Sequence, residues 1–306
     1  MADFLNGVLA AVLTPLHADT APDHAAMAAH CRWLLDHGCD GLSVLGTTGE
    51  ANSFTVAERI AILEALGRSG IPPRVLMPGT GCCALADTVA LCRAALDLGA
   101  SGVLVLPPFY YKNVSDDGLF AACADIVEQV GDDRLRIYLY HFPQMSGVAI
   151  GPPLIERLLK AYPGAFAGMK DSSGDLGGMI RTAQAFPGFA VFSGSDEFLL
   201  PVLRAGGAGC ITAVANVAAF LAAEVLAAFQ RGDEKAAEAA QERLSRVRQI
   251  VAAYPLTAAL KEIMAAHTGN DGWRRLRPPL SLLAPAEAEA LRSVLQRERF
   301  CPPVLG

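Results

Sequence analysis

The sequence predicts an α/β protein built as a closed (β/α)8 barrel, the TIM-barrel fold, with a C-terminal helical extension. Three features predict this fold. Strand-like and helix-like segments alternate along the chain, there are eight strand-like segments, and Gly and Pro punctuate the strand ends. Alternation of this kind indicates parallel strands joined by helical crossovers. Eight such units within about 230 residues match a closed barrel better than an open sheet.

The predicted strands are short apolar runs rich in Val, Ile and Leu, several of which end in a Pro-containing turn. They cover residues 7–16, 41–46, 74–81, 102–109, 136–143, 166–173, 190–196 and 209–216. Turns such as "LTP", "LPP" and "HFP" at the ends of these runs suit loops at the mouth of a barrel.

The segments between the strands carry apolar residues at helical spacing, as in 55–70 and 87–100, and several end in glycine. After residue 233 the pattern is helical only. Helices are expected at 234–254, 256–267 and 285–300. We therefore predict a barrel over residues 1–233 and a three-helix extension over residues 234–306. Since no low-complexity linker separates them, the extension is expected to pack against the barrel.

Composition excludes several classes of function. The formal net charge is −6 and no basic run appears, so nucleic acid is not an expected partner. No apolar run reaches membrane-spanning length, and the N-terminus lacks the basic start of a signal peptide. The eight cysteines are scattered, which indicates a reduced, cytoplasmic protein. His30, Cys31, His37 and Cys39 are the residue types that bind metals, but Cys31 and His37 would lie on different faces of a helix, so no metal site is expected there.

Lys170 is an unusual residue for the end of a buried strand, because burying its ammonium group is costly. At the carboxyl end of the sixth predicted strand it would lie where barrel enzymes have their active sites. One interpretation is structural: the amine pairs with a carboxylate, such as Asp171, or reaches solvent. The other is chemical: a desolvated, uncharged lysine attacks a carbonyl to form a Schiff base.

Two other strand ends offer partners for such an amine. The "GTTGE" segment at 46–50 could form a backbone nest that binds a carboxylate with help from Thr47 and Thr48, although an ordinary turn fits equally well. Tyr140 ends the fifth strand, which neighbours the strand of Lys170, so its phenol could transfer protons. Packing is the alternative role for this tyrosine.

Taken together, "GTTGE", the last tyrosine of "YLYHFP" and "GMKDSSGD" resemble the dihydrodipicolinate synthase / N-acetylneuraminate lyase superfamily of pyruvate-dependent class I aldolases. The resemblance extends over nearly the whole chain. It implies that Lys170 forms the Schiff base with the 2-keto group of the substrate and that Tyr140 relays protons. It further implies that Thr48 links Tyr140 to Tyr111, which reaches across a subunit interface.

The resemblance also implies the remaining contacts and the assembly. Thr47, Thr48 and their backbone would hold the carboxylate of the keto acid, and Ile211 would flank the pyruvyl group. The expected assembly is a homotetramer, a dimer of dimers, with a 2-keto acid such as pyruvate as substrate and no metal or organic cofactor. In "SGSDE" at 193–197, Gly194, Asp196 and Glu197 are candidate substrate contacts. Asp196 could instead cap a helix.

The far end of the expected pocket decides the reaction. Synthases of the superfamily carry an arginine just after the Tyr–X–X–Pro motif, where this sequence has Met145. Methionine cannot grip a second carboxylate, so the favoured function is cleavage of a 2-keto-3-deoxy sugar acid, or related 4-hydroxy-2-keto acid, to pyruvate and an aldehyde. Alternatives are a 2-keto-3-deoxy acid dehydratase, dihydrodipicolinate synthase (4-hydroxy-tetrahydrodipicolinate synthase) and a keto-acid-binding sensor without turnover.

Overall fold

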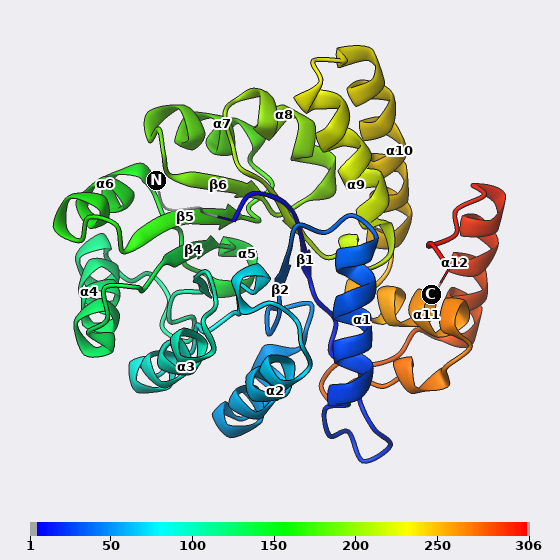
Figure 1. Ribbon diagram of the computed structural model, residues 1–306, viewed down its shortest axis with the longest axis horizontal. Helices are drawn as coiled ribbons and strands as arrows, with labels where there is room; N and C mark the ends of the chain where they lie inside the picture. The colour runs from blue at the N-terminus through cyan, green and yellow to red at the C-terminus, as the bar shows by residue number, and fades with distance from the viewer. Residues whose placement is uncertain (1–4, 305–306) are drawn as a thin grey trace.

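The protein is described by a computed structural model that covers residues 5–304 of the chain. Parallel strands lie at the centre and helices surround them (Figure 1). The TIM-barrel fold with C-terminal helices is confirmed. No helix within residues 5–304 combines the length and the apolar character needed to cross a membrane. The signal-peptide prediction relied on the first residues of the chain, of which 1–4 lie outside the described range.

Within the described chain, seven strands form a single sheet whose order is β2-β1-β7-β6-β5-β4-β3. All the paired strands are parallel. The strands are β1 (Gly7–Ala11), β2 (Gly41–Ser43), β3 (Val103–Val105), β4 (Ile137–His141), β5 (Phe166–Asp171), β6 (Ala190–Ser193) and β7 (Gly209–Thr212).

The third predicted strand, 74–81, is not a regular strand, so this detail of the sequence prediction is wrong. The segment nevertheless lies between β2 and β3. Met77 donates its N–H to the carbonyl of Leu42 at 2.9 Å, and the carbonyl of Pro78 accepts from Leu104 at 2.8 Å. Since proline has no N–H, Pro78 interrupts the ladder. Hydrogen bonds on both sides of the segment therefore close the ring without a continuous strand.

The helices follow the predicted alternation. The α-helices are α1 (His24–Asp36), α2 (Val56–Arg68), α3 (Leu85–Leu98), α4 (Asp116–Val130), α5 (Pro143–Ser146), α6 (Pro152–Ala161), α7 (Leu176–Ala185), α8 (Leu199–Arg204), α9 (Ala215–Gln230), α10 (Glu234–Ala252), α11 (Leu256–Thr268) and α12 (Pro285–Arg297). Short 3-10 helices are η1 (Ala51–Ser53), η2 (Pro73–Val75), η3 (Asp196–Phe198) and η4 (Asp271–Trp273). Side-chain caps define several starts: Thr55 and Glu58 form a capping box on α2, and Asp175 caps α7.

The three C-terminal helices coincide with the three helical segments predicted after residue 233. Figure 1 shows α11, in orange, between α1 and α12, which is red. Helix α10 contacts both α11 and α12. Leu244 of α10, Leu260 of α11 and Leu291 of α12 belong to the same buried cluster as Val8 of β1. The extension therefore shares a hydrophobic core with the barrel. Treating it as a unit separate from residues 1–233 stays a prediction.

A separate cluster fills the inside of the barrel, as expected for this fold. Its buried members are Leu9, Ala11, Met77, Leu104, Tyr138, Tyr140, Ala167, Phe192 and Ile211. The register between β4 and β5 shifts by one residue near Ile137, so that Tyr138 is opposite Gly168 and Tyr140 is opposite Lys170. A bulge of this kind re-aims the side chains that follow it. Lys170 therefore shares the inner face of the barrel with Tyr140.

Candidate active site

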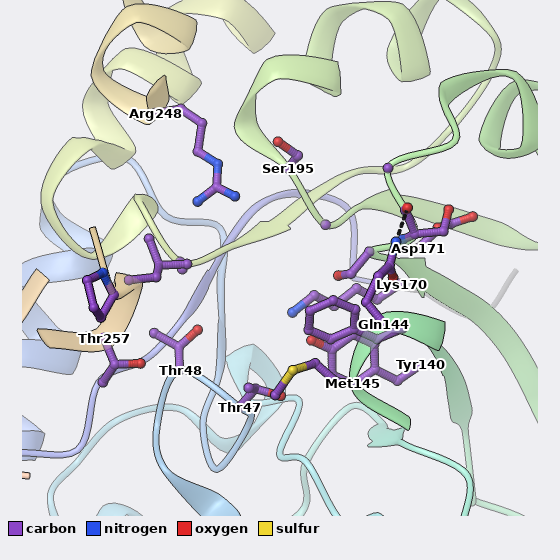
Figure 2. Close-up of a pocket in the computed structure, with 18 of the residues that line it drawn as sticks. Thr47, Thr48, Tyr140, Gln144, Met145, Lys170, Asp171, Ser195, Arg248 and Thr257 are labelled. Carbon is purple, nitrogen blue, oxygen red and sulfur yellow. Dashed lines mark hydrogen bonds between the residues drawn. The ribbon is translucent and has the colours of Figure 1, made fainter. Parts of the chain in front are cut away.

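A cavity of about 780 Å³ opens where the carboxyl ends of the strands meet the C-terminal helices. This volume is within the usual range for small-molecule sites. Several side chains around it are labelled in Figure 2. Of the site residues predicted from the sequence, those that line the cavity are Thr47, Thr48, Tyr140, Met145, Lys170, Gly194 and Glu197. The strand ends named by the motifs therefore meet at one place.

Lys170 is 5% exposed, and its Nζ lies 4.4 Å from the centre of the Tyr140 ring. No side chain or carbonyl between residues 5 and 304 forms an ion pair or a hydrogen bond with this amine. The Asp171 carboxylate, which the structural interpretation offered as a partner, instead accepts the N–H of Ser173 at 2.8 Å. The amine is therefore buried at the cavity without a carboxylate partner.

The "GTTGE" loop follows β2 and has left-handed backbone angles at both ends, with φ of 58° at Leu45 and 59° at Glu50. The hydroxyl of Thr14, in the loop after β1, holds the "GTTGE" loop in place by donating to the carbonyl of Gly49 at 2.8 Å. The N–H groups of Thr47 and Thr48 donate to no protein group in the described range. Two unpaired N–H groups at the cavity wall are what an anion nest requires.

Glu50 fastens this loop to the C-terminal extension. Its carboxylate pairs with Lys261 of α11, and both side chains are fully buried. The Glu50 Oε2 also accepts the N–H of Arg277 at 3.0 Å, and Lys261 donates to the carbonyl of Arg275 at 2.6 Å. Burial lowers the pKa of Lys261, and Glu50 opposes this effect. The "GTTGE" loop is therefore held jointly by the barrel and the extension.

The loop after β6 approaches β5 closely at Gly194. Its N–H donates to the carbonyl of Asp171 at 2.7 Å, and a Cβ added at this glycine would lie 2.0 Å from the hydroxyl oxygen of Ser172. Only glycine fits such an approach. Glu197 follows on η3, where its carboxylate accepts from Gln249 of α10 at 3.0 Å.

The sequence model of the dihydrodipicolinate synthetase family matches residues 4–298. The chain belongs to this family. A protein named an uncharacterized DapA-like lyase, from Chloroflexus aurantiacus, is 40% identical over 95% of this chain and 96% of its own length. A 4-hydroxy-tetrahydrodipicolinate synthase from Acidiphilium cryptum is 32% identical over 95% of this chain and 97% of its own.

A solved structure of the dihydrodipicolinate synthetase family shows the same fold. YagE, a prophage protein of E. coli K12 in complex with pyruvate, superimposes with a TM-score of 0.88 at 28% identity. The match covers 97% of this chain and 99% of YagE. The family resemblance read from the motifs is thus confirmed. The family includes proteins named as lyases and as synthases.

Several predicted members of this family site lie outside the cavity lining. Asp196 is fully buried, and its Oδ1 accepts from Thr212 at 2.6 Å. Burial raises its pKa, while Thr212 and Arg248 act in the opposite direction. It does not cap a helix either, because the N-cap of η3 is Ser195. Asp196 therefore connects the loop after β6 to β7 rather than facing a substrate.

Ile211, Tyr111 and Met145 occupy three different settings. Ile211 is buried in the inner cluster, and Ala213, two residues later, lines the cavity in its place. Tyr111 is 73% exposed and packs edge-to-face on Tyr110, away from the cavity of its own chain. Met145 lies at the rim on α5. The link from Thr48 to Tyr111 that the family implies is thus not made within one chain.

Sequence reasoning missed several lining residues of this family member. Gln144, Ser195, Arg248 and Thr257 carry polar groups to the cavity wall (Figure 2). Arg248 and Thr257 come from the extension, where the sequence shows only an amphipathic helical pattern.

Residues 5–304 contain no cluster of His, Cys, Asp or Glu suited to a metal ion. The buried His30 contacts the amide oxygen of Asn216 at 3.0 Å, and burial lowers its pKa to about 4.

Proposed function

We propose that this protein is a Schiff-base lyase that splits a 2-keto-3-deoxy sugar acid, or a related 4-hydroxy-2-keto acid, into pyruvate and an aldehyde. The observation that carries this proposal is Lys170 at the cavity, 5% exposed, without a carboxylate partner in the described chain and against the ring of Tyr140. An amine at the cavity that is not held in an ion pair is positioned to attack the carbonyl carbon of a bound keto acid.

The chemistry uses groups that the cavity holds. Lys170 Nζ adds to C2 of the keto acid and water leaves, which gives an iminium ion. Tyr140 first gives its phenolic proton to the hydroxyl that leaves as water, and then takes the proton of the C4 hydroxyl. The C3–C4 bond breaks, and its electrons move into the iminium to give an enamine. The aldehyde departs with C4. Protonation at C3 and hydrolysis then release pyruvate and restore the amine, so no metal or organic cofactor is needed.

The carboxylate next to the keto group needs an anion site close to Lys170. The unpaired N–H groups of Thr47 and Thr48 line the same cavity and supply donors for it. Hydrogen bonds from backbone N–H groups to a carboxylate are charge-assisted and stronger than neutral ones. Two fixed points, the covalent imine and this nest, would orient C3 and C4 within the cavity.

The runner-up function is 4-hydroxy-tetrahydrodipicolinate synthase, which the Acidiphilium cryptum relative favours. Met145 at the cavity rim argues against it, because a thioether cannot replace the arginine expected after the Tyr–X–X–Pro motif. Two assays separate the candidates. The first is pyruvate release from a panel of 2-keto-3-deoxy acids. The second is condensation of pyruvate with aspartate semialdehyde, and efficient condensation without pyruvate release would replace the lyase proposal.

Imine formation is tested by borohydride reduction in the presence of pyruvate. We expect a stable adduct on the peptide that contains Lys170, whereas binding of pyruvate without an adduct would indicate a sensor. Release of a dehydrated keto acid instead of pyruvate would indicate a dehydratase. Full activity after exhaustive treatment with a chelator is expected for chemistry that depends only on the lysine.

Tyr140→Phe tests the proton-transfer role. Removing the phenolic hydroxyl should lower kcat of cleavage by roughly 10²-fold, the lower end for general acid–base groups, and change KM little. Tyr138→Phe is the matched control. Tyr138 lies on the same strand, its hydroxyl is buried without a partner, and burial raises its pKa to about 12. Equal kinetic effects of the two substitutions would reject Tyr140 as the proton-transfer group.

The proposal also includes a homotetrameric assembly and a cytoplasmic location. The exposed pair of Tyr110 and Tyr111 suits a subunit contact, in line with the homotetramer expected for the family. Sedimentation velocity on the purified protein and on the Tyr111→Ala variant measures how many subunits assemble. The eight cysteines are all free thiols in the structure, which supports a reducing, cytoplasmic setting.

A further inference from the structure

Arg248 differs from the other two arginines of α10, because it has no hydrogen-bond or ion-pair partner within residues 5–304. On the same helix, Arg243 pairs with Glu224, and Arg246 pairs with Glu298 at 2.6 Å. Arg248 forms no hydrogen bond or ion pair with any residue from 5 to 304, although its Nε is buried. A buried donor left unpaired is costly, so an arginine in this position calls for an acceptor from outside the protein.

The side chain is directed into the cavity. Arg248 is half-buried on α10 and lines the cavity together with Lys170 and Thr48. Figure 2 shows its guanidinium group reaching from the helix into open space, while Lys170 and Tyr140 come from β5 and β4. The cavity therefore has a covalent attachment point contributed by the barrel and a cation contributed by the extension.

The carboxylates closest to Arg248 in the described chain form no ion pair with its guanidinium group. Asp196 is close enough for Arg248 to influence its pKa, but it forms no ion pair with the guanidinium; its Oδ1 accepts from Thr212, and its Oδ2 is buried without a partner. Glu197 accepts from Gln249, the next residue on α10. Neither carboxylate contacts the guanidinium, so its forked donors face the cavity available for a planar anion.

We propose, building on the lyase function above, that Arg248 binds a second anionic group of the substrate, distal to the keto carboxylate. The substrate class is then a 2-keto acid with a further carboxylate or phosphate at its far end. The nest at Thr47 and Thr48 takes one anion, Lys170 takes the keto carbon, and Arg248 takes the other anion.

The test uses keto acids of equal length that differ only in the terminal group. The carboxylate pairs are 2-oxoglutarate with 2-oxopentanoate, 2-oxoadipate with 2-oxohexanoate, and 2-oxopimelate with 2-oxoheptanoate. Each competes with labelled pyruvate for borohydride trapping on Lys170, and each is also measured by its shift of Tm. A phosphate arm compares 2-keto-3-deoxy-6-phosphogluconate with 2-keto-3-deoxygluconate.

We expect that the doubly anionic member of at least one pair competes at a roughly tenfold lower concentration, as for a charge-assisted hydrogen bond. R248Q should remove this preference, and R248K should restore part of it. R246Q on the same helix should keep the preference in full, because Arg246 is exposed and paired with Glu298. The arm that shows the preference, carboxylate or phosphate, identifies the anion.

The outcomes separate this inference from the lyase function. Trapping of pyruvate without any preference for a dianion, or with a preference that survives in R248Q, overturns the role of Arg248 and leaves the lyase function standing. Failure of pyruvate trapping overturns the lyase function. In that case the Tm shifts decide the role of Arg248, because binding of a dianion does not require the imine.

Discussion

Lys170→Met is expected to abolish borohydride trapping of pyruvate and to lower kcat/KM for cleavage by at least about 10³-fold, roughly 4 kcal/mol of transition-state free energy. Methionine keeps most of the length of the side chain and its contact with the Tyr140 ring, so the barrel should fold normally. What disappears is the nucleophile. Without an imine, the electrons of the breaking C–C bond have no sink, and no other lysine lines the cavity within the described chain.

Two further variants make this result specific. Lys170→Arg keeps a positive charge at the same strand position but removes the amine nucleophile, so it should be as inactive as the methionine variant. Lys160→Met, at an exposed site on α6, should trap pyruvate and cleave substrate like the unaltered protein. Residual activity above about a tenth in Lys170→Arg would mean that charge, not covalent attachment, carries catalysis.

The sequence predicts the fold well because its signals are local. Helical spacing of apolar residues and capping residues mark α2 and the helices of the extension. The segment around Pro78 is the exception. Its apolar pattern resembles a strand. Pro78 lacks an N–H, but whether this breaks the regular strand pairing depends on the strands that lie on both sides of it, which the sequence does not show.

The site could be predicted from the sequence where reactive side chains lie at the ends of strands. Lys170 and Tyr140 end neighbouring strands, so barrel geometry alone brings them together. Asp196 shows one limit of prediction from the sequence, because the setting of its carboxylate depends on Thr212 of the next strand. Arg248 shows another, since helical periodicity tells which face of α10 is polar but not that this face borders the cavity.

The extension therefore contributes to the site at two points. One is Arg248 at the cavity wall, and the other is Lys261, which holds Glu50 at the end of the "GTTGE" loop. The two members of the second contact are 211 residues apart in the sequence, so only the folded chain shows that they meet. Binding of the keto carboxylate is thus expected to depend on the packing of α11, not only on the barrel loops.

Lys261→Met is expected to destabilise the protein by about 3–5 kcal/mol, the usual cost of removing one partner from a buried ion pair. The Glu50 carboxylate would remain fully buried, with the N–H of Arg277 as its only described hydrogen-bond donor. Denaturant-induced unfolding, followed by far-UV circular dichroism, measures the change in the free energy of unfolding. The folded fraction of the variant should also show a higher KM for keto acids, because Glu50 holds the loop that carries Thr47 and Thr48.

The double variant Lys261→Met/Glu50→Gln distinguishes a buried charge from a simple loss of packing. Glutamine removes the charge but keeps an oxygen that accepts from Arg277, so most of the lost stability should return. If the defect of Lys261→Met were only a packing defect, adding Glu50→Gln would restore nothing and would add its own cost. If the free energy of unfolding of Lys261→Met alone lay within about 1 kcal/mol of that of the unaltered protein, the charge-burial explanation would be contradicted, because surface ion pairs contribute only that much.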